Sequence, residues 1–156
     1  MGKCFVIQPF DKGRYDKRYE DVFAPAIRDA GLEPYRVDRD PSVSIPIEDI
    51  EAGIKSCEAC LAEISTDNPN VWFELGYAIA SQREVVLVCS EERTSRYPFD
   101  VQHRSVIPYS TESPRDFEQL RTQITARLKA LIQRMERLGQ VAQMSSVAKV
   151  ENDWYG

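Results

Sequence analysis

The sequence lacks a long hydrophobic segment, an excess of basic residues and a glycine-rich phosphate-binding motif. The apolar run near its start covers only residues 4–7 before Gln8 and Pro9, which is too short for a signal peptide core or a membrane span. Its 20 Lys and Arg residues are outnumbered by 25 Asp and Glu residues, which makes nucleic acid and anionic membranes poor candidate partners. We therefore expect a cytoplasmic protein with no nucleic-acid partner and no membrane partner.

Residues that bind metals are also scarce, with four cysteines and one histidine in 156 residues. Cys57 and Cys60 form a C-x-x-C pair, a spacing that suits half a zinc site or a redox pair. No second pair follows, however, and His103 is the single histidine. The favoured interpretation is a helix end that runs into a buried strand, and we expect no metal and no other cofactor.

Short apolar segments alternate with segments of helical periodicity along the chain. The strands are predicted at residues 4–10, 32–37, 60–64, 84–89 and 104–109. The helices are predicted at residues 19–30, 47–54, 69–82 and 113–139. Pro25 interrupts the first helix, which predicts either a kink or a new turn that begins at Ala24. Asn68 and Pro69 suit the N-cap and the first position of the third helix.

This alternation predicts an α/β fold, a doubly wound and mainly parallel five-stranded sheet in the order 2-1-3-4-5. Such a sheet forms a flavodoxin-like three-layer sandwich, whose ligand crevice lies at the carboxyl ends of the strands, here beside strands one and three. The chain length suits one domain, which we place at residues 1–139. Residues 140–156 are polar with isolated apolar residues, so we expect a C-terminal tail, a linker or a segment ordered by a partner.

Glu74 is the candidate functional residue of the crevice. On a helical wheel it lies at the border of an apolar stripe that includes Val71, Leu75 and Ala78. Helical side chains lean toward the N-terminus, so its carboxylate would point to the strand ends and feel the positive end of the helix dipole. Burial would raise its pKa and the dipole would lower it, and a nucleophile needs the second influence to prevail. The alternative is an exposed helix glutamate, the commonest environment of this residue type.

Several segments resemble the nucleoside 2-deoxyribosyltransferase superfamily, which also contains nucleotide N-glycosidases and is structurally close to TIR domains. The most specific is NPNVWFELGYA at residues 68–78, and CFVIQPF at 4–10, RVD at 36–38 and IEDI at 47–50 add to it. The resemblance covers residues 4–109. It implies cleavage or transfer at the N-glycosidic bond of a nucleoside, nucleotide or NAD-like substrate. It also implies a homo-oligomer, because transferases of this group commonly build their sites across subunits.

The resemblance implies roles for single residues. Glu74 matches the glutamate that attacks the anomeric carbon of the sugar, and Asp49 matches an aspartate that contacts the base and helps to protonate it. Asn68 stands where the transferases usually carry an aspartate that holds sugar hydroxyls, and the neighbouring Asp67 is the alternative for that role. Tyr15 is the counterpart of an aromatic residue that steadies the catalytic carboxylate.

Other candidate residues lie in the loops after the strands. The further substrate-binding residues that we predict there are Gln8, Pro9, Phe10, Asp38 and Ser65. If the substrate carries a phosphate, the N–H groups of Asn70 and Val71 and the side chain of Arg14 are the available anion site. For Asp40 a solvated charge cluster is a simpler interpretation than a site residue. For His103 the simpler interpretation is a place in the loop between the fourth and fifth strands.

Two other classes of function remain open on the sequence. In the first, the same pocket binds a nucleotide without turning it over, as in a TIR-like signalling module of the kind found in bacterial antiphage defence. In the second, the domain acts only through protein contacts at Trp72, Tyr77 or the C-terminal tail. A phosphoacceptor receiver domain shares the fold, but Pro9 and Phe10 stand where its paired acids would follow the first strand.

Overall fold

The computed structural model describes residues 2–39, 46–98, 101 and 104–155. Its strands are β1 (Lys3–Ile7), β2 (Glu33–Tyr35), β3 (Ala59–Glu63), β4 (Val85–Ser90) and β5 (Val106–Tyr109). They form one sheet in the order β2-β1-β3-β4-β5, and every neighbouring pair is parallel. The predicted α/β fold with the strand order 2-1-3-4-5 is confirmed.

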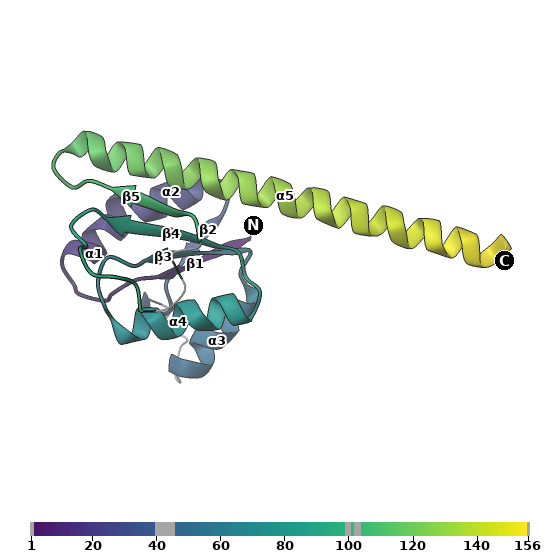
Figure 1. Cartoon of the computed structure of the whole chain (residues 1–156), viewed down its shortest axis with the longest axis horizontal. Coiled ribbons are helices and arrows are strands. Elements are labelled where there is room, and N and C mark those ends of the chain that lie inside the picture. The colour runs from purple at the N-terminus through teal and green to yellow at the C-terminus, as the bar shows by residue number, and fades with distance from the viewer. Residues whose placement is uncertain (1, 40–45, 99–100, 102–103, 156) are drawn as a thin grey trace.

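Helices cover both faces of the sheet, because successive strand residues point to opposite faces. On one face Cys4 and Val6 pack against the π-helix η1 (Tyr19–Phe23), α2 (Ala24–Asp29) and the first half of α5 (Pro114–Tyr155). On the other face Phe5 and Ile7 pack against α3 (Pro46–Ser56) and α4 (Pro69–Ala80). Figure 1 shows α2 and α5 on one side of the sheet and α3 and α4 on the other. We call these the α2/α5 face and the α3/α4 face.

Local sequence explains where two of the helices begin. α2 starts at Ala24 directly after η1, with Pro25 in its first turn. Phe23 and Ala24 are both in the right-handed helical region, so the chain stays helical across this boundary. The new turn predicted at Ala24 corresponds to this start of α2. Asn68 is the N-cap of α4 and Pro69 is its first residue, as the sequence predicted. The helix ends at its C-cap, Ser81. Because α4 begins just after the carboxyl end of β3, its N-terminus lies at the crevice end of the sheet.

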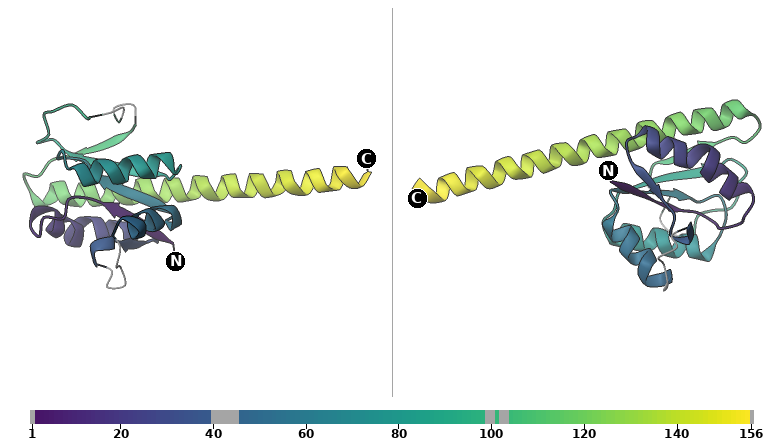
Figure 2. Two further views of the ribbon diagram at one scale, coloured as in Figure 1. Left: turned by 90° about the horizontal axis from the view of Figure 1, so that it is seen from below. Right: turned by 180° about the vertical axis from the view of Figure 1, so that it is seen from behind.

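The last helix is longer than predicted. We expected it to end near Gly139, but α5 is continuous from Pro114 to Tyr155. The segment after Gly139 contains no proline and many good helix formers, so a helix already nucleated on the sheet continues through one unfavourable glycine. Figures 1 and 2 show this second half extending away from the sheet. None of the described helices is both long and apolar enough to cross a membrane.

Candidate active site

Glu74 lies on the buried side of α4. Only 3% of its surface is exposed, and Val71, Leu75 and Ala78 of the same helix are in the α3/α4 core. The alternative prediction of an exposed helix glutamate is therefore wrong. Burial, and to a smaller extent the negative charge of Asp38, raise the pKa of Glu74 to about 7. Desolvation thus prevails over the helix dipole, which is the opposite of the balance expected for a nucleophile, and the carboxyl group takes up or releases its proton near neutral pH. Glu74 is therefore a carboxylate, the form that a nucleophile needs, only at and above about pH 7.

Asp38 is held by a buried arginine that the sequence did not single out as a site residue. Arg36, whose side chain is 1% exposed, donates to Asp38 from Nε at 3.0 Å and from Nη2 at 2.6 Å. The same Nη2 lies 3.0 Å from a carboxylate oxygen of Asp16 in α1 (Arg14–Arg18). The guanidinium is also stacked between two rings, with Cζ 5.1 Å from the centroid of Phe10 and 4.8 Å from that of Tyr19. Arg36 therefore ties the ends of β1 and β2 to α1.

Apart from Oδ1 of Asp16, which lies in the ion pair with Arg36, two buried polar atoms at this edge of the sheet have no hydrogen-bond partner within the described part of the chain. One is the Oε1 atom of Gln8, whose Nε2 atom donates to the carbonyl of Tyr15 at 3.2 Å. The other is the Nη1 atom of Arg36. Buried polar groups are nearly always paired, with protein, water or ligand. An unused acceptor and an unused donor beside the ends of β1 and β2 are suitable contacts for a polar ligand.

The loop between β3 and α4 uses its polar groups internally. The Asn68 side chain accepts hydrogen bonds from the backbone N–H groups of Asn70 at 2.9 Å and Val71 at 3.3 Å. The predicted anion site therefore does not form as expected, because both N–H groups already have a partner. Asp67 is exposed and pairs with Arg93 at 2.8 Å. Ser65 accepts a hydrogen bond from the N–H group of Ser90, which joins the ends of β3 and β4.

Replacing Asn68 with Ala should lower the free energy of unfolding by about 1 kcal/mol, because two N–H groups of the first turn lose their acceptor. Chemical denaturation measures the difference. Asn70→Ala is the matched control. Asn70 lies two residues after Asn68 and is exposed, so the same change there should alter the free energy of unfolding little. Equal losses in the two variants would contradict the capping role.

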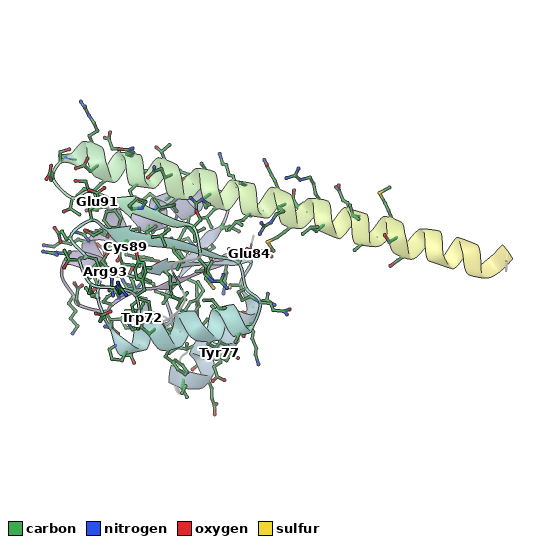
Figure 3. All side chains as sticks on the ribbon, viewed as in Figure 1. Trp72, Tyr77, Glu84, Cys89, Glu91 and Arg93 are labelled. Atoms are coloured by element: carbon green, nitrogen blue, oxygen red, sulfur yellow. The ribbon has the colours of Figure 1, made fainter. Side chains whose placement is uncertain are left out.

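Arg93 is a second buried arginine that sequence reasoning missed. Its side chain is nearly covered, and it donates to Asp67 and to the carbonyl oxygens of Ile64, Ser95 and Arg96. The guanidinium Cζ also lies 5.6 Å from the ring centroid of Trp72. Figure 3 labels Arg93 and Trp72 at the end of the sheet where α4 begins. Arg93 thus holds the loop after β4 against the loop that precedes α4.

Tyr15 belongs to a different polar cluster, built around Glu63 at the end of β3. The Tyr109 hydroxyl donates to Glu63, and Arg18 donates to the same hydroxyl at 3.0 Å. Burial raises the pKa of Glu63, and burial and the charge of Glu63 raise the pKa of Tyr15. Leu61 and Tyr109 belong to the α2/α5 core, and strand alternation places Glu63 on that face with them. Tyr15 therefore lies near Glu63, on the α2/α5 face, whereas Glu74 lies on the α3/α4 face, where the charge of Asp38 acts on its pKa.

The remaining candidates are placed less centrally. Asp49 is partly buried in the first turn of α3, the helix packed beside α4. Pro9 follows β1 and is buried, next to the exposed Phe10 that stacks on Arg36. Arg14 is exposed and pairs with Glu92 at 3.2 Å. Asp40 and His103 lie outside the described residues.

The cysteine pair lies where α3 ends and the buried strand β3 begins. Cys57 and Cys60 are buried, and their Sγ atoms lie 3.5 Å apart. Across the described ranges, no three His, Cys, Asp or Glu side chains are grouped so that they could hold a metal ion. The pair also lies at the amino end of β3, whereas Gln8, Arg36 and Asp38 follow the carboxyl ends of β1 and β2.

Comparison with solved structures shows the fold. A Clostridium botulinum CMP N-glycosidase, BcmB, is 20% identical, with a TM-score of 0.54 over 75% of this chain and 95% of its own. The TIR domain of the Toll-related receptor TRR-2 from Hydra magnipapillata is 12% identical, with a TM-score of 0.60 over 81% of this chain and 97% of its own. A diflavin flavoprotein A3 from Nostoc sp. is 13% identical, with a TM-score of 0.60 over 88% of this chain and 99% of its own.

At the level of sequence, no protein-family model matches the chain, and no curated protein is significantly similar to it. The three structures share the α/β architecture described above. One is a glycosidase, one a receptor domain and one a flavoprotein, so the likeness supports the fold, and the chemistry has to be argued from the residues of this chain.

Proposed function

We propose that this protein cleaves or transfers the N-glycosidic bond of a nucleoside, nucleotide or NAD-like substrate, with Glu74 as the nucleophile. The observation that carries the proposal is a buried glutamate on the first turns of α4, next to the Arg36–Asp38 pair. A carboxylate in such a position, at the strand ends where ligands of this fold bind, is typical of catalytic acids and nucleophiles. The CMP N-glycosidase among the structural neighbours supports the same reaction class.

In the proposed reaction, a carboxylate oxygen of Glu74 forms a bond to the anomeric carbon while the bond from that carbon to the base nitrogen breaks. The bonding pair leaves with the base, which takes up a proton, and Asp49 is our candidate donor. Water or a second base then attacks the same carbon, loses a proton and releases Glu74 as a carboxylate. Attack by water gives hydrolysis, and attack by a second base gives transfer.

The unpaired polar atoms at the edge of the sheet supply contacts for the substrate. The Oε1 atom of Gln8 is an acceptor for a sugar hydroxyl or a base N–H, and the Nη1 atom of Arg36 is a donor. Phe10 presents an exposed ring above Arg36 on which a base could stack. We propose these three residues as binding residues of this site.

A second candidate is a nucleotide-binding or signalling module that does not turn its ligand over. The observation in its favour is at Asn68, where the transferases usually carry an acid for the sugar hydroxyls. The Asn68 side chain instead caps α4, and Asp67 pairs with Arg93. The TIR domain among the structural neighbours supports this alternative.

One experiment separates the two candidates. The protein is incubated with separate nucleosides, nucleoside monophosphates and NAD, and released bases are measured by chromatography. We expect base release from at least one substrate class, its loss in Glu74→Gln and its retention in Glu136→Gln, a matched change at an exposed position of α5. Stabilisation by a nucleotide without any released base would favour the binding module. Absence of both would contradict both candidates.

Self-association stays a prediction. The resemblance implies a homo-oligomer, and light scattering of the full chain measures its mass in solution.

A further inference from the structure

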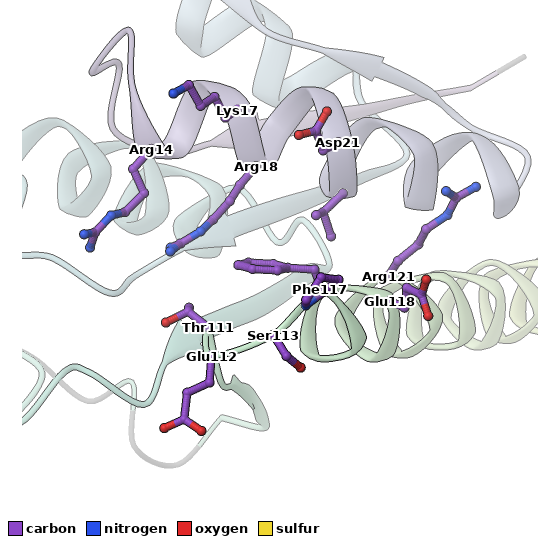
Figure 4. Close-up of a pocket in the computed structure, with 12 residues that line it drawn as sticks. Arg14, Lys17, Arg18, Asp21, Thr111, Glu112, Ser113, Phe117, Glu118 and Arg121 are labelled. Atoms are coloured by element: carbon purple, nitrogen blue, oxygen red, sulfur yellow. The ribbon is translucent and has the colours of Figure 1, made fainter.

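A cavity of about 710 Å³ lies between α1, η1 and the start of α5. Arg14, Lys17 and Arg18 line it from one wall, and Phe117 and Arg121 line it from the other. Figure 4 shows these two walls facing each other. The cavity belongs to the α2/α5 face of the sheet, whereas Glu74 lies on the α3/α4 face. It is therefore separate from the candidate active site, and the inference below does not depend on the proposed function.

Arg18 is the unusual feature of this cavity. Only 8% of its surface is exposed, and its Cζ atom lies 5.3 to 5.5 Å from the ring centroids of Tyr15, Tyr109 and Phe117. Its Nη1 atom donates to the neutral Tyr109 hydroxyl, and no carboxylate of a described residue lies within ion-pair distance. Glu63, on the other side of that hydroxyl, is one compensating charge. Burying a cation without a direct anionic partner costs free energy, and an anion bound next to Arg18 would lower this cost.

The surroundings of Arg18 favour a phosphate at one end of the cavity. In Figure 4 the guanidinium groups of Arg14 and Arg18 reach toward the same side, where the Thr111 side chain also lies. Glu118 lies toward the other end, near Arg121, Asp21 lies on the opposite wall, and the Glu112 side chain points away from that wall. Arg14 and the Thr111 hydroxyl both donate to the carboxylate of Glu92, at 3.2 and 2.9 Å. A phosphate at this end of the cavity would take the place of Glu92 and accept a further hydrogen bond from Arg18.

Part of the cavity wall is apolar. Val22, Pro114 and Phe117 line the space next to these polar groups. A ligand that reaches them needs an apolar body attached to its phosphate. We infer that this cavity binds a small phosphomonoester, whose phosphate accepts hydrogen bonds from Arg18 and Arg14 and whose apolar part packs against Phe117 and Val22.

Isothermal titration calorimetry of the full chain with phenyl phosphate tests this site. We expect phenyl phosphate to bind more tightly than inorganic phosphate, which lacks the apolar part, and than benzoate, which carries a carboxylate. Arg14→Gln should weaken binding of phenyl phosphate about tenfold through loss of a charged hydrogen bond. The matched control is Arg115→Gln, because Arg115 is exposed near the same helix end but does not line the cavity.

Two further variants locate the bound ligand. Glu74→Gln should bind phenyl phosphate as the unmodified protein does, because Glu74 lies across the sheet. Arg18→Lys keeps the charge but loses the planar donors, and should weaken binding more than Arg14→Gln, with folding checked by circular dichroism. The inference is overturned if phenyl phosphate does not bind, if benzoate or inorganic phosphate binds equally well, or if Arg14→Gln and Arg115→Gln behave alike. Loss of binding in Glu74→Gln would also overturn it and place the ligand at the other site.

Discussion

Replacing Glu74 with Gln should abolish base release and at the same time make the fold more stable at pH 8, by about 3 kcal/mol. The loss of activity, at least about a thousandfold, follows from removal of the nucleophile. The gain in stability has a different origin. Burial and the charge of Asp38 together raise the pKa of Glu74 from 4.5 to about 7 in the folded protein, so ionising the carboxyl group costs more free energy there than in the unfolded chain.

The sign of this effect gives a characteristic dependence on pH. Below pH 4.5 the glutamate is neutral in both states and carries no such penalty. Between pH 4.5 and about 7 the unfolded chain ionises first, so the unmodified protein loses stability as pH rises, and above about 7 the loss is complete. Glu74→Gln does not ionise, so its advantage should grow through this window and then remain constant.

Urea denaturation of both proteins at several pH values measures the difference, with Glu136→Gln as the matched control at an exposed site. A difference that stays constant from pH 4 to pH 8 would contradict the raised pKa of Glu74. Full base release by the Glu74→Gln variant would contradict the proposed nucleophile, whatever its stability.

Replacing Arg36 with Met should lower the free energy of unfolding by about 3 kcal/mol, because it breaks a buried ion pair and leaves two carboxylates without their cation. Asp16 and Asp38 are partly exposed and regain some hydration, so we expect the lower part of the range for buried pairs. The substitution should also raise the pKa of Glu74, since the charge of Asp38 is no longer neutralised beside it.

The matched control is Arg39→Met, three residues further on, where an exposed arginine pairs with Glu20 at 3.0 Å. An exposed pair contributes less than about 1 kcal/mol, so this variant should unfold nearly as the unmodified protein does. If Glu74 acts as a carboxylate, base release should rise with pH up to about 7 in the unmodified protein and at higher pH in Arg36→Met. Equal destabilisation by the two variants, or an unchanged pH profile, would contradict this account of Arg36.

Patterns of short range predicted the fold well. The continuous apolar run of β4 indicated a strand buried on both faces, and Val86 and Leu87 indeed belong to opposite cores. Asn68 and Pro69 marked the start of α4, because capping depends only on neighbours in the sequence. The predicted end of α5 was wrong. The apolar pattern fades after Gly139 because the helix no longer packs against the sheet, and not because the helix ends there.

The neighbours of the site were harder to predict. The periodicity around Glu74 identified its buried side, but no local pattern indicates that Asp38 lies near it or that Arg36 neutralises Asp38. Tyr15 follows β1 as expected, yet its side chain faces Glu63. These contacts join loops that follow different strands. Because the loops are far apart in the sequence, no local pattern indicates which of their side chains meet.

The sequence by itself determined the sheet order, the position of α4 and the buried side of Glu74, because each depends on periodicity, capping and the alternation of strands along the chain. The tertiary structure alone decided which charges meet. It placed Arg36 between Asp16 and Asp38, and it placed Arg18 among three rings, with no carboxylate of a described residue within ion-pair distance. The strength and the pKa effect of a charge depend on burial and on partners distant in the sequence, and only the folded chain brings these together.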